Sequence, residues 1–484
     1  MGPLWGKGWL NNIGTNAARR LALNTAAPMA ARLIDAAFAV VYLRLLGRSE
    51  VGAYTFLVVF TTYLDTLLDF GLNALVAREV SRGSVAPSTA FRAVNLLRLG
   101  LWLVGLPIAA VMYFVFPRAA NLSTQDALAG AIFYLALLPT VLAKTATSLL
   151  WAAERLDLTA AVSVVATVLK TALGATLLFT GFGVVGLAAA SLIVNVVTAV
   201  TLWRLISWES VQRQGQAPIR WLRESWPLFV NQLLQGLFFK VDALLLPGLA
   251  GLAAAGVYGA AYKVSEGAGI VSSSFTLALF PRLSRASDTT EAYRLGLRLL
   301  LQIGLPLAAG VALLAEPIVA VVGGRDYLPD SAVALAILIC YLPLSYANGL
   351  TQYVLIAAGR QRLLTAAFVG ALAFNVVANL LLIPRFSYVG AAWVTVLSEL
   401  VLLVPFQRAA ARVAPGVSVF SEARIPIFAT LLMAPVVWWL RDSVHPIAAI
   451  VAGVGVYALA LWSLGGIDGQ QRRLLQQLVR RSAL

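Results

Sequence analysis

Six basic and six acidic side chains fall inside long apolar stretches of this 484-residue chain. A charge at bilayer depth costs about 2.5–3.5 kcal/mol on insertion scales, so each of these residues must face protein or water. The bases are Arg32, Arg98, Lys144, Lys170, Lys240 and Lys263, and the acids are Asp35, Asp65, Asp69, Asp242, Glu266 and Glu399. The bases could bind an anionic cargo, whereas the acids are candidates for proton or sodium coupling or for structural ion pairs.

Arg32 and Asp35 are three residues apart and therefore share one helical face. This spacing allows two interpretations. Arg32 could form a structural ion pair with Asp35 that holds two helices together, or it could line a polar cavity that receives an anion.

Two further helices carry polar stripes at steps of three or four residues. The first stripe is Thr61, Asp65 and Asp69, and the second is Thr140, Lys144, Ser148 and Trp151. Stripes of this kind also hold membrane helices together, so we expect the neutral members to make interhelical contacts. A set of charges this large nevertheless indicates a wet interior.

The composition is that of a polytopic membrane protein. The chain is 60% hydrophobic and 12% charged, with a mean hydropathy of +0.85. In a soluble protein the formal charge of +15 would suggest a nucleic-acid partner; here it indicates arginines at the cytoplasmic membrane face, and we expect no nucleic acid. One cysteine, Cys340, and one histidine, His445, leave little for a metal site, and no cofactor is expected.

Fourteen apolar runs are long enough to span a membrane, which predicts an all-α fold. The expected spans are 25–46, 51–73, 93–117, 126–150, 158–180, 184–206, 226–248, 255–280, 295–322, 331–357, 363–384, 388–410, 423–440 and 444–464. With the amino terminus inside, 24 of the 36 Lys and Arg residues fall on the inner side, 6 on the outer side and 6 within helices. This bias predicts a multi-pass protein of the cell membrane with both termini in the cytoplasm.

Three sequence matches recur at one offset of 204 residues. Gly47–Tyr54 matches Gly251–Tyr258 in both glycines and the tyrosine, and Leu96–Leu101 matches Leu300–Leu305. A third match joins Phe182, Val185 and Gly186 to Phe386, Val389 and Gly390. Because the offset carries the first span onto the seventh, the repeats have the same orientation. We therefore expect two parallel six-helix lobes, 1–207 and 208–412, followed by two further helices and a basic tail in 413–484.

Several motifs resemble one family. The first expected helix ends in Arg44-Leu45-Leu46-Gly47 and is followed by Glu50-Val51-Gly52-Ala53-Tyr54. Further similar motifs are Asp69–Leu72, Lys240–Leu246, Gly256–Lys263, Leu382–Phe386 and Gly390–Ala392. Together they resemble the Wzx-type oligosaccharide flippases of the multidrug/oligosaccharidyl-lipid/polysaccharide exporter superfamily. The resemblance covers roughly Ala22 to Ala411.

The resemblance implies a fold and a function. It implies that the two lobes face each other across a central cavity and move a lipid diphosphate-linked glycan from the inner to the outer leaflet by alternating access. It also implies that the chain is not an enzyme. The implied partners are the lipid diphosphate-linked oligosaccharide, membrane lipids and other glycan-assembly membrane proteins.

The resemblance further places Arg32, Lys240 and Lys263 around the central cavity, where we expect them to bind the diphosphate together. Arg98, Lys144 and Lys170 belong to the first lobe, and their repeat counterparts are largely uncharged: Gln302 replaces Arg98, and Lys170 falls near Asn375. The two lobes therefore differ in their intramembrane charge, and we expect the path of the anion to lie nearer the first lobe.

Three alternatives remain at this stage. A cation-coupled multidrug exporter of the same superfamily would need an acidic cavity, and the equal numbers of intramembrane bases and acids argue mildly against it. A flippase for a cell-wall lipid-linked disaccharide fits the chemistry, although the motifs resemble it less. A membrane glycan polymerase or ligase would need a large outer loop with catalytic residues, for which the short connections leave no room.

Overall fold

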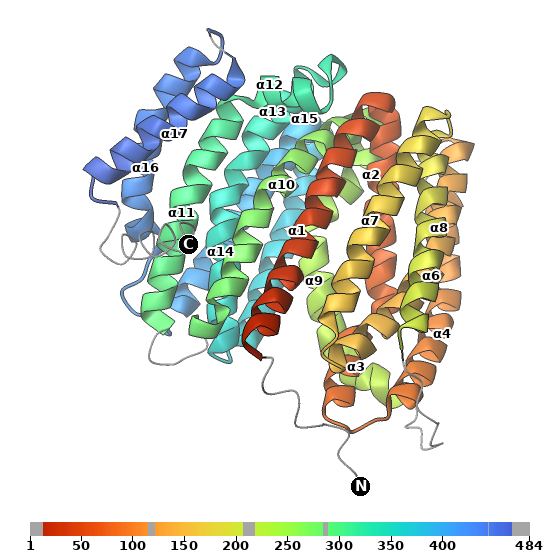
Figure 1. The fold of residues 1–484 in the computed structure, drawn as a ribbon. Coiled ribbons are helices and arrows are strands. Elements are labelled where there is room, and N and C mark those ends of the chain that lie inside the picture. The colour runs from red at the N-terminus through yellow and green to blue at the C-terminus, as the bar shows by residue number, and fades with distance from the viewer. Residues whose placement is uncertain (1–12, 115–121, 207–217, 284–288, 444, 467–484) are drawn as a thin grey trace. The chain divides into compact units, whose positions relative to one another are not determined.

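The computed structural model describes residues 13–114, 122–206, 218–283, 289–443 and 445–466. Within these ranges the chain forms helices and no strand, which confirms the predicted all-α fold (Figure 1). The contacts divide the chain into two compact units, Met1–Gly259 and Ala260–Leu484.

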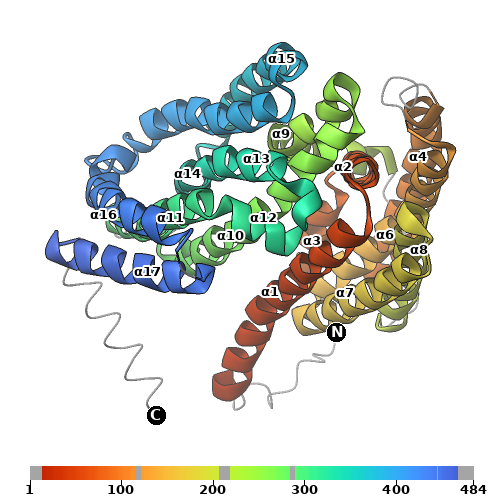
Figure 2. The ribbon, with the colours of Figure 1, turned by 90° about the horizontal axis from the view of Figure 1, so that it is seen from above.

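The first unit contains seven helices longer than twenty residues and one short helix, α3, within its described ranges. They are α1 (Ile13–Leu45), α2 (Arg48–Asp69), α3 (Leu72–Ser81), α4 (Pro87–Phe114), α6 (Thr124–Ala152), α7 (Leu156–Phe179), α8 (Gly183–Arg204) and α9 (Pro218–Ala250), followed by the first residues of α10 (Leu252–Leu283). The closest packing is of α6 on α8, α1 on α7 and α7 on α8. Figure 2 shows α6, α7 and α8 as neighbours from above.

The second unit contains the rest of α10 and the remaining helices. These are α11 (Thr289–Leu313), α12 (Ala315–Val322), η2 (Arg325–Tyr327), α13 (Asp330–Leu338), η3 (Ile339–Tyr341), α14 (Leu342–Ala357), α15 (Gln361–Ala410), α16 (Val419–Leu440) and α17 (Pro446–Ser463). Helices α16 and α17 form a pair that packs on α11 (Figure 1). A hydrogen bond of 2.7 Å from the Tyr457 hydroxyl to the Gln302 carbonyl fastens α17 to α11.

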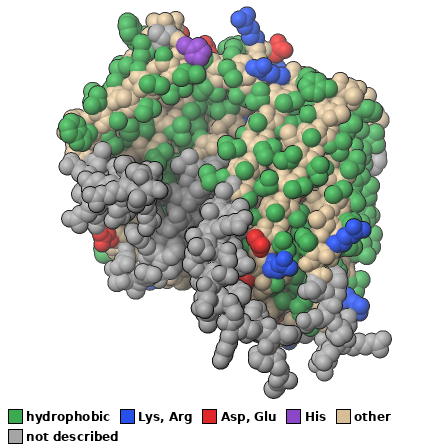
Figure 3. All heavy atoms as spheres, in the orientation of Figure 1, with side chains coloured by type: hydrophobic (Ala, Val, Ile, Leu, Met, Phe, Trp, Pro, Cys, Tyr) green, Lys and Arg blue, Asp and Glu red, His purple; other side chains and the backbone are tan. Residues whose placement is uncertain are grey.

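The fourteen predicted spans account for these helices. Within the described residues, eleven helical stretches are long and apolar enough to cross a membrane, counting α2 with α3 and α13 with α14. One of them, α15, is 50 residues long and breaks at Ser387, whose φ of 51° and ψ of −137° are not helical, so it corresponds to two spans. Adding α1 and α10, with 33 and 32 residues, gives fourteen. On the face that Figure 3 shows, apolar side chains cover the helices and charged ones lie toward the two ends, as a protein facing lipid requires.

Helix α2 ends at a break that glycine makes possible. Phe70 and Gly71 both have positive φ, 48° and 72°. A Cβ at Gly71 would lie 2.8 Å from the Leu228 Cβ and 3.0 Å from the Phe229 backbone nitrogen, so no larger residue fits against α9. The Phe70 ring stacks on Phe229 at 4.4 Å between centroids. The break therefore turns the chain from α2 into α3 while keeping both helices on α9.

The repeated glycines meet where α2 crosses the start of α10, inside the first unit. A Cβ at Gly52 would lie 1.8 Å from the Leu252 carbonyl oxygen, and a Cβ at Gly256 would lie 1.8 Å from the Arg48 carbonyl oxygen. Gly52 and Gly256 are separated by 204 residues, as are Arg48 and Leu252, so the two close contacts repeat at the offset found in the sequence. Reciprocal contacts of this kind are what a local two-fold relation between repeats produces.

The predicted lobes, 1–207, 208–412 and 413–484, were defined by repeats in the sequence. The two compact units are defined by contacts between residues in the structure, so they need not coincide with the lobes. Helix α9, which begins the second sequence repeat, packs on α2 and α3 in the first unit. The lobe boundaries and the parallel relation of the lobes therefore stay predictions.

Candidate functional site

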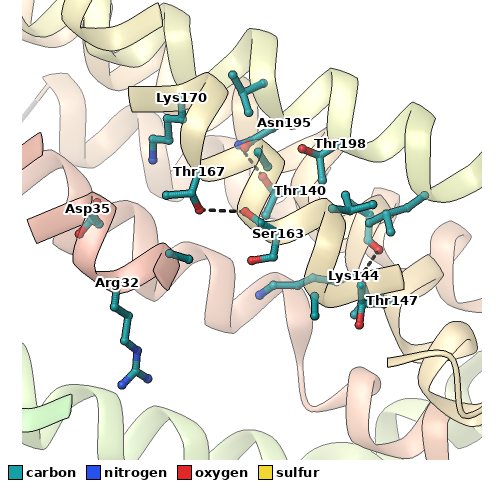
Figure 4. A pocket seen from close by; sticks show the side chains of 18 of the residues that line it. Arg32, Asp35, Thr140, Lys144, Thr147, Ser163, Thr167, Lys170, Asn195 and Thr198 are labelled. Atoms are coloured by element: carbon teal, nitrogen blue, oxygen red, sulfur yellow. Dashed lines mark hydrogen bonds between the residues drawn. The ribbon is translucent and has the colours of Figure 1, made fainter. Parts of the chain in front are cut away.

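The first unit contains an open cavity of about 700 Å³ between α1, α2, α6, α7 and α8 (Figure 4). Its polar lining residues are Arg32, Asp35, Thr140, Lys144, Thr147, Thr159, Ser163, Thr167, Lys170, Thr171, Asn195 and Thr198. Phe38, Tyr54 and Trp151 add aromatic surface. We call this space the first-unit cavity.

Helix α7 supplies a hydroxyl stripe to the first-unit cavity that the sequence analysis missed. Thr159, Ser163, Thr167 and Thr171 follow one another at steps of four, so they share one face, and Lys170 lies beside them. The spacing was present in the sequence. The spacing alone does not single these residues out, because hydroxyl residues are ordinary in membrane helices, where they hydrogen-bond to their own backbone.

The hydroxyl and amide hydrogens of the wall are partly engaged within the protein. Thr140 donates its hydroxyl hydrogen to the Ala136 carbonyl at 2.7 Å, and Thr167 donates to the Ser163 carbonyl at 2.9 Å. Asn195 donates its amide to the Thr140 hydroxyl at 2.8 Å. With these hydrogens engaged, the oxygens retain lone pairs that can accept from a ligand hydroxyl.

The first-unit cavity carries an excess of positive charge. Its described lining holds three bases, Arg32, Lys144 and Lys170, and one acid, Asp35. Figure 4 shows Lys144 and Lys170 among the hydroxyl groups, while the Arg32 side chain extends away from them at the edge of the site. The Lys144 ammonium also forms an ion pair of 2.6 Å with Asp65 on α2.

A smaller cavity of about 270 Å³ adjoins the first. Asp65 lines it together with Thr61, Thr62 and Ser191. Thr140, Lys170 and Asn195 line both cavities, so they form a shared wall. The predicted stripe of α2 therefore faces this smaller space through Thr61 and Asp65.

Arg98 and Asp69 are buried and lie in a separate network. The Arg98 side chain is 0% exposed and donates to Asp69 at 2.7 Å, to the Asn73 side chain at 2.8 Å and to the Val141 carbonyl at 2.7 Å. It also donates to the Thr145 hydroxyl. These contacts join α2, α3, α4 and α6, and neither Arg98 nor Asp69 lines the first-unit cavity. Ser148, a member of the second predicted stripe, does not line the cavity either: its hydroxyl donates to the side-chain oxygen of Asn73 at 3.0 Å.

Lys240 and Asp242 lie on α9, away from the lining of the first-unit cavity. Asp242 is buried and accepts a hydrogen bond of 2.7 Å from the Ala243 backbone and another from the Tyr258 hydroxyl. Of the three bases expected to bind the diphosphate together, only Arg32 therefore lines this cavity.

Lys263 and Glu266 lie on α10 in the second unit and form an ion pair of 3.2 Å across one helical turn. In the same unit Glu399 is buried and accepts a hydrogen bond of 2.7 Å from the Asn348 amide. No three His, Cys, Asp or Glu side chains of the described residues come close enough to hold a metal ion.

Fold and cavity together define the class: a multi-pass, all-helical membrane protein with a cavity inside one helical unit that three bases and several hydroxyl groups line. The family profile described as polysaccharide biosynthesis protein matches residues 41–332, more than half of the chain. The chain belongs to this family of polysaccharide biosynthesis proteins.

Solved structures share the fold. The lipid II flippase MurJ in an inward closed conformation matches with a TM-score of 0.78 at 14% identity, covering 90% of this chain and 97% of MurJ. An inward-facing multidrug resistance MATE family transporter of the MOP superfamily matches with a TM-score of 0.61 at 17% identity, covering 81% and 97%. A MOP superfamily transporter from Pyrococcus furiosus matches with a TM-score of 0.54 at 15% identity, covering 81% and 95%.

Among curated proteins no sequence matches significantly. The family match confirms the resemblance to proteins of polysaccharide biosynthesis, the solved structures show that the fold is shared, and a Wzx-type flippase is consistent with both.

Proposed function

We propose that this protein is a flippase that moves a lipid diphosphate-linked oligosaccharide from the cytoplasmic to the outer leaflet for cell-surface polysaccharide. It acts by alternating access and without chemical change to its cargo. The observation that carries the proposal is the first-unit cavity, where an excess of bases meets a hydroxyl-rich wall. Membership in a polysaccharide biosynthesis family supports it.

The chemistry of the cargo fits such a cavity. A diphosphate linkage is anionic, and moving an ionised group into a low-dielectric medium without compensation costs tens of kcal/mol on the Born estimate. The ammonium groups of Lys144 and Lys170 offset that cost through charge-assisted hydrogen bonds. Lone pairs of Thr140, Thr167 and Asn195 accept hydrogen bonds from sugar hydroxyls.

The same charge balance argues against a multidrug exporter for cationic drugs. Three bases and one acid line the cavity, and even with Lys144 paired to Asp65 a positive charge remains, which disfavours a cation and favours a phosphate. The similarity to MATE family transporters concerns the fold alone. The charge of the cargo is inferred from the residues that line the cavity.

The test is flipping in proteoliposomes that carry a fluorescent lipid diphosphate oligosaccharide, read by the fraction of the label accessible from outside. Lys170→Gln should lower the initial rate about tenfold or more, because a charge-assisted hydrogen bond contributes about 1.5–3 kcal/mol. Arg204→Gln is the matched control, since Arg204 ends α8 outside the cavity lining. Equal rates for the two variants, or transport of a cationic dye in place of the glycolipid, would sink the proposal.

A further inference from the structure

Trp151 lines the first-unit cavity at the end where α6 passes into α7, and it is 48% exposed. The indole nitrogen donates a hydrogen bond of 3.2 Å to the Thr159 hydroxyl, and this hydroxyl donates in turn to the Leu156 carbonyl at 2.9 Å. Membrane proteins often place tryptophan at helix ends as an interface anchor, but an anchor needs no place in a cavity lining. Two hydrogen bonds in series thus orient an aromatic ring whose surface stays accessible.

The end of the cavity around Trp151 is neutral. The described lining residues at this end of α6 and α7 are Trp151, Leu156, Thr159 and Ala160, and none of them carries a charge. A flat aromatic surface with a hydroxyl beside it is therefore what a ligand meets there.

The bases lie further along the same two helices. Lys144 precedes Trp151 by seven residues on α6, about 10 Å along the axis, and Lys170 follows Thr159 by eleven on α7, about 16 Å. Seven and eleven residues are close to two and three helical turns, so each pair shares a helix face. The lining thus divides into a charged part and an aromatic part within one space.

A ligand with an anionic end and a sugar end fits this division. A pyranose ring carries C–H groups on its faces and hydroxyl groups around its edge, and the C–H groups pack on the electron-rich face of an aromatic ring. Thr147 and Ser163 lie between the two parts of the lining, where their oxygens can accept from sugar hydroxyls. A cavity of about 700 Å³ has the size of a site for a small ligand, so a longer glycan extends beyond it.

We propose that Trp151 stacks on the sugar next to the diphosphate and makes the cavity selective for glycosylated lipid diphosphates over bare ones. The diphosphate lies at Lys144 and Lys170, and the sugar lies toward Trp151, so the cargo has one orientation in the cavity. This inference rests on the proposed function, because it needs a sugar diphosphate in the first-unit cavity. Trp151 is then a specificity-determining residue that recognises a pyranose with an apolar C–H face and not the whole glycan.

The experiment measures the Kd of the purified protein for two probes by titration calorimetry. One probe is a short-chain alkyl diphosphate that carries glucose, whose ring substituents can all be equatorial. The other is the same alkyl diphosphate capped by a methyl group in place of the sugar, so the two probes have equal charge. The wild-type protein should bind the glucose probe about fivefold or more tightly than the methyl probe.

Three variants assign this preference to the ring. Trp151→Leu keeps an apolar side chain without a ring and should bind the two probes about equally. Thr159→Val keeps Trp151 but removes the acceptor that orients it, so the preference should fall severalfold. Trp439→Leu is the matched control, because Trp439 of α16 is 68% exposed and lies outside the cavity lining, and it should keep the wild-type preference.

A fourth variant, Lys170→Gln, tests the charged part of the lining separately. It should weaken the binding of both probes by the same factor, because each carries the same diphosphate. Melting temperatures within a few degrees of the wild type establish that the variants are folded, and Thr159→Val decides the matter if Trp151→Leu does not fold.

The outcomes separate the two proposals. Equal binding of the probes by the wild type, a preference unchanged in Trp151→Leu or Thr159→Val, or an equal loss in Trp439→Leu would overturn the role of Trp151. In each of these cases binding of the methyl probe that weakens in Lys170→Gln still supports the proposed function. If the wild type binds neither probe, the proposed function fails and the role of Trp151 fails with it.

Discussion

The Arg98 guanidinium is buried from solvent and receives its compensation from three helices at once. Asp69 of α2 supplies the charge, and the side chains of Asn73 on α3 and Thr145 on α6 supply further acceptors. Burying an ion pair is costly, and its geometry repays the cost only while both partners are present. This pair therefore locks the α2–α3 break to the helices around it.

Replacing Arg98 should destabilise the protein far more than replacing a cavity base. Arg98→Gln leaves Asp69 as an uncompensated buried charge, which costs about 3–5 kcal/mol. The double variant Arg98→Gln with Asp69→Asn should recover much of the loss, because no net charge remains buried. Thermal unfolding of the purified proteins measures this, with Lys170→Gln as the control that should barely change the melting temperature. An unchanged melting temperature for Arg98→Gln would contradict the role assigned to the pair.

Arg32 should act on the cargo through its charge rather than through a fixed fork of hydrogen bonds. It is exposed at the edge of the first-unit cavity, so Arg32→Ala should lower flipping severalfold, while Arg32→Lys should keep most of the activity. The measurement is the initial flipping rate at equal expression. If Arg32 instead serves only Asp35, adding Asp35→Ala to Arg32→Ala would restore the lost activity.

At this scale the sequence could identify which residues carry chemistry, but it could not assign their roles. Arg98 and Lys144 are both single bases in apolar helices, and each lies within reach of an acid on α2. Which base faces a cavity depends on the rotation of α4 and α6 about their axes, and hydropathy does not report rotation. The expected grouping of Arg32 with Lys240 and Lys263 rested on resemblance, and it stays a prediction for the protein as a whole.

At the scale of the element, the crossing of α2 over the start of α10 is a place where the chain tolerates only glycine. Both glycines of the repeated motif face a backbone carbonyl of the opposite helix at a distance that leaves no room for a methyl group. Small residues permit backbones to approach in this way, and membrane helices use such crossings for close packing. The repeat in the sequence thus corresponds to a physical contact.

Gly52→Ala should therefore disrupt folding or assembly of the first unit. A Cβ at 1.8 Å from the Leu252 carbonyl oxygen forces the helices apart, at a cost of about 1–3 kcal/mol or more. Gly100→Ala is the matched control, because a Cβ at Gly100 within α4 meets nothing within 4 Å. Size-exclusion profiles and melting temperatures in detergent give the comparison. Equal behaviour of the two variants would show that the crossing is not close-packed.

At the scale of the whole molecule, the hydropathy of the sequence was sufficient for the number and order of helices. A helix must satisfy its own backbone in lipid, so each apolar run long enough to span became a helix. The predicted split between 363–384 and 388–410 is confirmed by the backbone break at Ser387. The break between α11 and α12 at Leu314 was not predicted, although Glu316 and Pro317 mark the first turn of α12 in the sequence.

The orientation in the membrane is predicted from the Lys and Arg residues of the loops alone. Of the 36 Lys and Arg residues, 24 are assigned to the inner segments and 6 to the outer ones, and a shift of one helix in the count would reverse the alternation for every later loop. A reporter fused after Ile206 and one fused after Leu464 should therefore both read cytoplasmic. The outer loop after Phe179 provides the control, where the same reporter should read periplasmic or extracellular. An even number of spans separates the two fusion points, so opposite readings at them would refute the count of fourteen. Outward readings at both points would keep the count but reverse the orientation.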